Sequence, residues 1–287
     1  MKNISEHSDY QLLDSGSGNK LERVGPHLLV RPSPQSVWLP SLPENKWKDA
    51  DAVYIRSSSG GGSWKFNRRI PEKWEIEYEG YRFIIKPTGF GHLGIFPEQR
   101  ESWKWISEMV TGAEREINVL NLFAYTGGST LAAAAAGANV CHLDSAKGIV
   151  DWARENAVLS GLGGNPIRWI VDDVTKFIHK EIRRGKRYDA IILDPPSFGR
   201  GNKGEVWKIE DDLPKLLRDC KEILSDNPLF VLLSCHSPGF TPIVLQNLVA
   251  DMVKKKSGNI SCAEMTITEA SSGRPLPCGC YARWSSK

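Results

Sequence analysis

The sequence contains no apolar run that approaches the ~18 residues needed for a membrane-spanning helix. Residues 1–10 are polar and lack the apolar centre of a signal peptide. We therefore expect a cytoplasmic protein with no membrane partner.

Regularly spaced cysteines are also missing, because most of the six cysteines lie inside apolar runs. This pattern favours reduced, buried thiols over a disulfide framework. Cys278 and Cys280 form a C-x-C pair, but no second pair or histidine cluster stands at zinc-ligand spacing. We expect these two residues to belong to a strand and expect no metal site. The net charge of +3 is too small to identify or exclude an acidic partner.

The composition is that of a globular protein, with 40% hydrophobic and 25% charged residues, and argues against a disordered chain. Residues 20–86 are rich in Pro, Gly, Ser and Trp. Within them, residues 74–78 and 81–85 alternate around a Glu79-Gly80 turn, which predicts a hairpin. We expect a small β-rich domain at residues 1–88, which either binds substrate or supports folding, and a larger domain at residues 89–287.

The larger domain alternates strand-like and helix-like segments. Residues 98–110 carry apolar side chains at helical spacing and predict a connecting helix. Five strand and helix pairs follow, at 118–123 and 129–136, 139–143 and 147–159, 167–171 and 174–184, 190–193 and 213–224, and 229–233 and 242–253. This alternation predicts a doubly wound α/β fold with a mostly parallel sheet. Residues 260–268 and 280–284 add a closing antiparallel hairpin, which gives a seven-stranded, Rossmann-like sheet.

Candidate cofactor residues follow the first three strands of this sheet, where open α/β sheets bind their ligands. Residues 121–128, N-L-F-A-Y-T-G-G, end a buried strand in a glycine turn that lets the backbone approach a ligand. Asp144 ends the next strand, where an acid binds a ribose diol. Asp173, with Asp172 as the second choice, ends the third strand, where a carboxylate can accept from an adenine amino group.

A nicotinamide-dependent dehydrogenase would use the same fold and the same ribose acid. Its G-x-G-x-x-G fingerprint is missing, however, because T-G-G at residues 126–128 does not match it. A cofactor without phosphates suits this loop better, and a closing hairpin is more typical of methyltransferases. We therefore expect S-adenosyl-L-methionine as the cofactor.

The loop after the fourth strand reads Asp194-Pro195-Pro196-Ser197-Phe198. The two prolines fix the backbone, so the motif predicts an acid and an aromatic ring directed at the methyl group. Residues 199–204 follow, with Arg200 and Lys203, and read either as a mobile basic lid over phosphates or as an ordinary loop.

The loop after the fifth strand contains Cys235 and His236. Both loops lie at the carboxyl edge of the sheet, so we expect Cys235 to face Asp194. A thiolate there can add to C6 of a pyrimidine and make C5 nucleophilic enough to accept a methyl group. His236 or nearby positive charge would activate the thiol. The alternative is a buried structural cysteine.

The glycine loop, Asp144 and the Asp-Pro-Pro motif together carry a family resemblance. Three further motifs add to it: I-F-P-E-Q-R at residues 95–100, V-D-D-V at 171–174 and S-C-H at 234–236. Residues 90–285 resemble the class I methyltransferases related to the bacterial large-subunit ribosomal RNA 5-methylcytosine methyltransferases. The resemblance implies an RNA substrate, ribosomal in those enzymes, and implies Cys235 and Asp194 as catalytic residues. The residues predicted to hold the cofactor are Gln99, Arg100, Asn121, Phe123, Tyr125, Thr126, Gly127, Gly128, Asp144, Asp172, Asp173 and Asp194.

Two departures from that family stand in the sequence. The N-terminal RNA-binding module of the family is not recognisable in residues 1–86, and His236 replaces the serine expected after the cysteine. Relatives with the same fold methylate guanine and lack the cysteine. One alternative is therefore methylation of a base nitrogen or of a protein side chain, for which Cys235 would be dispensable. A second alternative is a non-catalytic RNA-binding protein that retained the fold. The sequence carries no signal for the oligomeric state.

Overall fold

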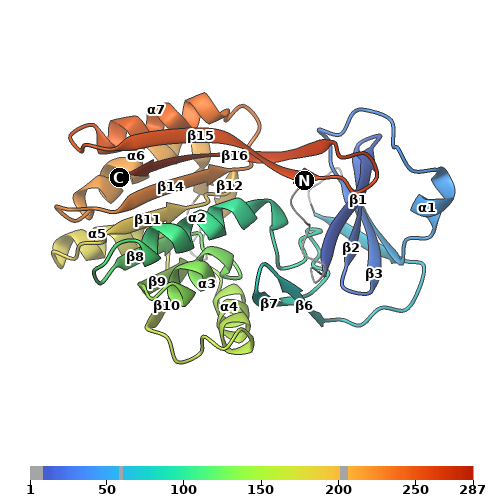
Figure 1. The fold of residues 1–287 in the computed structure, drawn as a ribbon, viewed down its shortest axis with the longest axis horizontal. Helices are drawn as coiled ribbons and strands as arrows, with labels where there is room; N and C mark the ends of the chain where they lie inside the picture. The colour runs from blue at the N-terminus through green and yellow to red at the C-terminus, as the bar shows by residue number, and fades with distance from the viewer. Residues whose placement is uncertain (1–8, 58–60, 201–205, 287) are drawn as a thin grey trace. The chain divides into compact units, whose positions relative to one another are not determined.

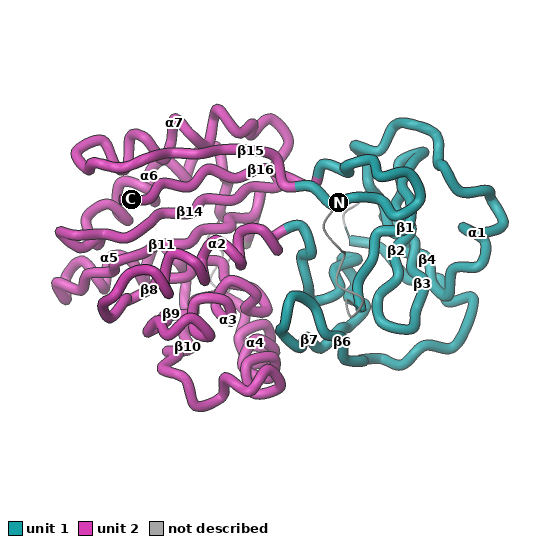
Figure 2. The backbone as a smooth tube through the Cα atoms, viewed as in Figure 1, with its two compact units in different colours: residues 1–98, 266–277 teal, residues 99–265, 278–287 magenta. Residues whose placement is uncertain are grey.

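The computed structural model describes residues 9–57, 61–200 and 206–286. The chain divides into two compact units, shown in Figure 2. Unit 1 comprises residues 1–98 and 266–277, and unit 2 comprises residues 99–265 and 278–287. The tip of the last hairpin thus belongs to unit 1. The functional division expected after residue 88 stays a prediction.

Unit 2 is built on a seven-stranded sheet with the order β10-β9-β8-β11-β14-β16-β15 (Figure 1). The first five strands in this order pair in parallel, and β16 pairs with β14 in antiparallel fashion. The predicted doubly wound sheet with its closing hairpin is confirmed. The strands are β8 (Asn118–Leu122), β9 (Asn139–Asp144), β10 (Ile167–Val171), β11 (Ala190–Leu193), β14 (Phe230–Cys235), β15 (Asn259–Thr268) and β16 (Pro275–Ser285).

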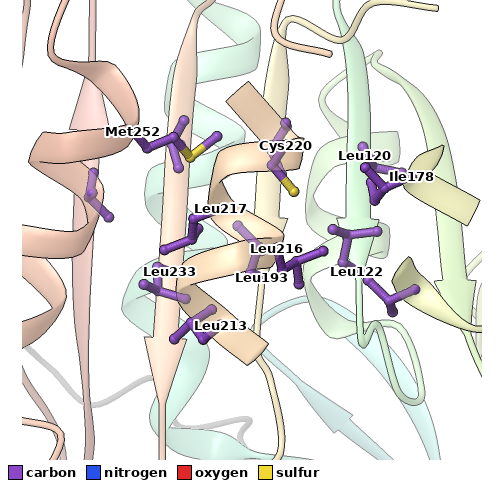
Figure 3. Packing of buried hydrophobic residues seen from close by; sticks show 14 of the residues in the cluster. Leu120, Leu122, Ile178, Leu193, Leu213, Leu216, Leu217, Cys220, Leu233 and Met252 are labelled. Carbon is purple, nitrogen blue, oxygen red and sulfur yellow. The ribbon is translucent and has the colours of Figure 1, made fainter. Parts of the chain in front are cut away.

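Helices cover both faces of this sheet. On one face, Phe177, Leu216 and Val249 of three helices pack against alternate residues of the central strands, and Figure 3 shows part of this cluster. On the other face, the ring of Trp105 meets Phe230 at 5.0 Å between centroids. Burial on both faces explains why the central strands are continuous apolar runs. The helices are α2 (Arg100–Thr111), α3 (Gly128–Ala135), α4 (Lys147–Leu159), α5 (Val174–Arg183), α6 (Ile209–Glu222) and α7 (Pro242–Val253).

A local sequence signal sets the start of α7. Thr241 caps α7 by accepting a hydrogen bond from Val244 N, and Pro242 occupies its first turn, where a missing N–H costs nothing. By contrast, α6 begins at Ile209, four residues before the predicted start, and accommodates Pro214 in its interior. The short strands β12 (Phe198–Arg200) and β13 (Val206–Lys208) form a hairpin that the sequence did not predict.

Unit 1 contains a five-stranded sheet of order β1-β2-β3-β4-β5 and a separate hairpin, β6-β7. This hairpin turns at Glu79 and Gly80, both at positive φ, as the sequence predicts. The hairpin tip of residues 266–277 is fixed to β1, where Ser271 Oγ donates to Asp14 Oδ1 at 2.9 Å. The elements are β1 (Tyr10–Gly16), β2 (Asn19–Val24), β3 (His27–Pro32), α1 (Glu44–Lys48), β4 (Ala52–Arg56), β5 (Gly62–Phe66), β6 (Trp74–Tyr78), β7 (Tyr81–Ile85) and η1 (Pro97–Gln99). In the part of the chain that the structure describes, no helix is long and apolar enough to cross a membrane.

Candidate active site

The glycine loop leaves β8 at the carboxyl edge of the sheet and is tightly turned. Phe123, Tyr125 and Gly127 all adopt positive φ, at 55°, 47° and 95°. Positive φ is unfavourable for residues other than glycine, so the surrounding contacts must hold Phe123 and Tyr125 in place. The loop ends at Gly127, from which α3 begins.

Asp144 supplies one of these contacts. Its Oδ2 atom accepts a hydrogen bond from Tyr125 N and its Oδ1 atom from Ala146 N, both at 3.1 Å. Burial raises the pKa of the Asp144 carboxyl, and the backbone N–H donors act in the opposite direction. The acid predicted to bind a ribose therefore lies directly beside the glycine loop and also shapes it.

A buried polar chain supports the loop from inside. Asn121 Nδ2 donates to Thr130 Oγ1 at 2.9 Å, and this oxygen lies 2.9 Å from His142 Nδ1. Burial lowers the pKa of His142 to about 3, so the imidazole is neutral at pH 7. Asn156 Nδ2 donates to the carbonyl of Thr126 at 3.0 Å. Asn121 and Thr126 are themselves buried, and their predicted contact with the cofactor stays a prediction.

The sequence did not predict that the loop is supported by Thr130, His142 and Asn156. A signal was present, because Asn121 and His142 are polar residues with apolar neighbours on both sides in the interiors of β8 and β9. A buried polar side chain requires a partner, so two of them on neighbouring strands predict a pair.

Gly128 is fixed by packing. A Cβ atom at this position would overlap the ring of Trp103 on α2. Gly127 is required by its positive φ, and its own Cβ position makes only ordinary van der Waals contacts, with Ala153 at 3.4 Å and His142 at 3.8 Å. The two predicted loop glycines therefore have different structural requirements, and their approach to the cofactor stays a prediction.

The two acids after β10 have distinct partners. Asp173 caps α5 by accepting from Lys176 N at 2.9 Å. Asp172 pairs with Lys180 Nζ at 2.6 Å and accepts from Asp173 N at 2.9 Å. Both carboxylates lie at the carboxyl edge of the sheet as predicted, and their contact with an adenine stays a prediction.

Asp194 is the centre of a polar cluster after β11. Gln99 Nε2 donates to Asp194 Oδ2 and to Ser234 Oγ, each at 3.1 Å, and His236 Nδ1 lies 3.2 Å from Asp194 Oδ1. The structure thus brings together Gln99, Asp194 and His236 from three distant segments. Arg100, the neighbour of Gln99, pairs instead with Glu101 at 3.4 Å.

Cys235 ends β14 beside this cluster, but only 1% of the residue is exposed. Its Sγ accepts from Ser237 N at 3.4 Å, and Ser237 Oγ lies 2.6 Å from Ser197 Oγ, which joins the loops that follow β11 and β14. Burial raises the pKa of the Cys235 thiol, Asp194 raises it further, and His236 and Ser237 lower it. Across the strand pair, Cys235 stands opposite Cys280.

Trp207 on β13 lies at the candidate site and was not predicted from the sequence. Its Nε1 donates to Pro196 O at 2.7 Å, and its ring lies 5.2 Å from that of Phe123. It therefore joins the glycine loop to the Asp-Pro-Pro turn. No periodicity marked it, because Val206, Trp207 and Ile209 form only a short apolar group among charged residues. The basic lid predicted around Arg200 and Lys203 is untested, since Lys203 and the Arg200 side chain lie outside the described residues.

The chemistry of the donor set fits S-adenosylmethionine. Asp144 is the last residue of β9, Asp173 lies two residues after β10, and Asp194 follows β11 directly. All three therefore lie at the carboxyl edge of the sheet, as the glycine loop does. The cofactor offers two ribose hydroxyls, an adenine amino group and a positively charged sulfonium, all of which favour carboxylate acceptors. The loop itself adds no cationic side chain for a pyrophosphate.

Comparison with known proteins agrees with this assignment. Residues 56–255 match the model of an S-adenosylmethionine-dependent methyltransferase family. The crystal structure of a SAM-dependent methyltransferase from Agrobacterium tumefaciens is 42% identical, covers 99% of this chain and 92% of its own, and superposes with a TM-score of 0.93.

Curated relatives carry more specific names. Ribosomal RNA large subunit methyltransferase K of Neisseria meningitidis is 27% identical over 79% of this chain and 65% of its own length. Ribosomal RNA large subunit methyltransferase K/L of Shewanella frigidimarina is 33% identical over 57% of this chain, which spans only 22% of that relative. The expected resemblance is confirmed at the level of the methyltransferase and not at that of the 5-methylcytosine enzymes. The chain belongs to the S-adenosylmethionine-dependent methyltransferase family.

Proposed function

We propose that this methyltransferase modifies a base of RNA and that the acceptor atom is C5 of cytosine. The names of the curated relatives support ribosomal RNA as the substrate class. The observation that carries the choice of atom is the convergence of Cys235 and the Asp194–His236 pair at the ends of the adjacent strands β11 and β14.

The bound cofactor supplies an electrophilic methyl group, but C5 of cytosine is too weak a nucleophile to accept it unaided. Cys235 Sγ forms a bond to C6, and the C5–C6 π electrons move to C5. The Asp194–His236 pair provides the proton that neutralises the charge developing at N3. After methylation, C5 loses its proton to a base, the Sγ–C6 bond breaks to restore the thiolate, and N3 returns its proton to the Asp194–His236 pair.

Burial of Cys235 imposes a condition on this reaction. The thiol must be uncovered, so the turn at residues 234–238 moves when the base enters. Burial raises the pKa of the Cys235 thiol, and hydrogen bonds from Ser237, together with the nearby His236, lower it. Of these two neighbours, only His236 has a ring nitrogen that can accept the thiol proton, so we assign it that role.

The test compares Cys235→Ala with Cys280→Ala. The two cysteines are cross-strand partners in the same buried cluster, so both variants remove a buried thiol from one core. We expect Cys235→Ala to abolish methyl transfer to RNA and to abolish a covalent adduct with RNA that contains 5-fluorocytosine. We expect Cys280→Ala to retain both. Activity near wild type in Cys235→Ala would refute the nucleophile.

A second candidate is methylation of a base nitrogen, which the exposure of the site favours. The side chains of Asp194 and His236 are 27% and 30% exposed, whereas Cys235 is covered. In that reaction the Asp194–His236 pair accepts the proton of the attacking nitrogen, and Cys235 is dispensable. Mass spectrometry of the nucleosides from the methylated RNA distinguishes 5-methylcytosine from an N-methylated base.

A further inference from the structure

A cavity of about 720 Å³ lies at the amino ends of the parallel strands in unit 2. The cofactor loops leave the carboxyl ends of the same strands, and a strand of five residues spans roughly 16 Å, so the cavity and the active site lie at opposite edges of the sheet. The cavity is lined by Asn118, Asn139, Val140, Cys141, Asn165, Pro166, Ile167, Arg168, Gly185, Lys186, Arg187 and Tyr188. None of these residues belongs to the proposed catalytic or cofactor site.

One wall of the cavity is strongly basic. Residues 183–187 read R-R-G-K-R, and the turn is made possible by Gly185 at a φ of 62°. Lys186 and Arg187 line the cavity from this turn, and Arg168, 47% of whose side chain is exposed, lines it from β10. No carboxylate is among the described lining residues.

Two buried acids next to the cavity, Glu181 and Asp189, already have partners; Asp189 accepts from Asn118 N at 3.0 Å and lies 2.9 Å from Arg115. Glu181 accepts from the Tyr188 hydroxyl at 2.7 Å and from Arg184 at 2.9 Å, and it lies 3.5 Å from Arg168. Its single charge is shared among these donors, and it does not line the cavity. The positive charge of Lys186 and Arg187 is therefore directed to a ligand or to solvent.

The remaining lining suits a ring with polar edges. Ile167 and Tyr188 contribute apolar atoms to the lining. The Nδ2 groups of Asn118, Asn139 and Asn165 donate to Asp189, Glu116 and Ala134 O, so the amide oxygens of Asn139 and Asn165 supply the polar groups of this wall. The volume lies within the range of about 300–1,000 Å³ that small-ligand sites have. An anion alone would need neither the volume nor the apolar wall.

We propose that this cavity binds a nucleoside monophosphate, with the phosphate on Lys186 and Arg187 and the base against Ile167 and Tyr188. This site is separate from the methyl-transfer site and does not depend on the identity of the methylated base. Two cations on one turn can bind a phosphate dianion through charge-assisted hydrogen bonds.

The experiment measures AMP binding by calorimetry to protein saturated with S-adenosylhomocysteine, because the adenosine-binding part of the active site is then occupied. We expect AMP to bind and adenosine to bind at least tenfold more weakly. We expect the double variant Lys186→Ala, Arg187→Ala to weaken AMP binding at least tenfold and leave S-adenosylhomocysteine affinity unchanged. Both side chains are exposed, so the variant is expected to fold.

The matched control is Lys254→Ala, Lys255→Ala, which removes two exposed charges next to α7 and should leave AMP binding intact. Absence of AMP binding to the saturated wild type would overturn the proposal. Equal loss in both double variants would show a general charge effect and would also overturn it. The protein could instead bind a single-stranded RNA through Lys186 and Arg187 and not bind AMP. That result would overturn the nucleotide site and assign the two side chains to an RNA backbone.

Discussion

His236 Nδ1 lies 3.2 Å from Asp194 Oδ1, while Gln99 Nε2 donates to the other oxygen of the same carboxylate. Both carboxylate oxygens are thus engaged by groups from different segments of unit 2. Such a carboxylate is held in one orientation, which suits a group that must meet a substrate base at a fixed position.

Replacing Asp194 by Asn removes the negative charge and keeps the shape of the side chain. We expect Asp194→Asn to lower the turnover of methyl transfer about 100-fold, because proton transfer in the pair is lost. Single-turnover rates with radiolabelled cofactor measure this.

The chain offers a matched control in a second Asp–His pair, in which His179 Nε2 lies 3.0 Å from Asp219 Oδ2 at the surface. Asp219→Asn should leave the rate unchanged. A rate loss of equal size in both variants would show that the Asp194 effect is not local to the site.

Asp144 should matter for the cofactor and not only for the loop. We expect Asp144→Ala to weaken S-adenosylmethionine binding by about 1–3 kcal/mol through lost hydrogen bonds to the ribose. Calorimetry with S-adenosylhomocysteine measures the change.

Asp144→Ala also removes the acceptor of Tyr125 N, so the loop effect needs its own control. Asn156→Ala removes a comparable loop bond, the one to Thr126 O, without removing a ribose acceptor. A smaller loss is expected for Asn156→Ala. Equal losses would mean that Asp144 acts by shaping the loop.

Much of unit 2 could be predicted from the sequence, because its signals are local. The bounds of α4 and α7 agree with the predicted helices at residues 147–159 and 242–253, since apolar periodicity fixed α4 and Thr241 and Pro242 fixed the start of α7. The order of loops along the chain also placed Asp144, Asp194 and the glycine turn at one edge of the sheet.

The features that were missed depend on contacts between distant residues. Trp207 gains its role only because Phe123 and Pro196 come to it from other segments. The covering of Cys235 depends on packing beneath the sheet edge and on its strand partner Cys280, which no local pattern encodes. The membership of residues 266–277 in unit 1 likewise follows from contacts such as that of Ser271 with Asp14.

The Gly128 position should be sensitive to a single added methyl group. Because the new Cβ would overlap the Trp103 ring, we expect Gly128→Ala to lower the free energy of unfolding by about 1–3 kcal/mol. Gly148 in α4 has open space at its Cβ position, so Gly148→Ala should be neutral or stabilise the protein by up to about 1 kcal/mol. Urea denaturation compares the two, and equal stability of both variants would contradict the packing role.

His142 should make the protein less stable in acid. Its pKa is about 3 in the folded chain, because burial excludes the charged form, against an ordinary value of about 6.5. The unfolded chain therefore binds a proton between these values and the folded chain does not, so the free energy of unfolding falls as the pH is lowered below 6.5. The expected slope from this residue approaches about 1.4 kcal/mol per pH unit, and the loss ends near pH 3.

A comparison of variants separates the contribution of His142 from that of other titrating groups. The quantity compared is the slope of the free energy of unfolding against pH. His142→Asn can keep a partner for Thr130 but cannot gain a proton, so its free energy of unfolding should fall less steeply between pH 6 and pH 4 than that of the wild type. His179→Asn, at the surface, controls for replacement of a histidine. The comparison uses slopes of urea midpoints against pH, because the absolute stability of His142→Asn also includes lost packing. Parallel slopes for wild type and His142→Asn would mean that His142 is protonated in the folded protein. The buried group of Asn121, Thr130 and His142 would then carry a positive charge.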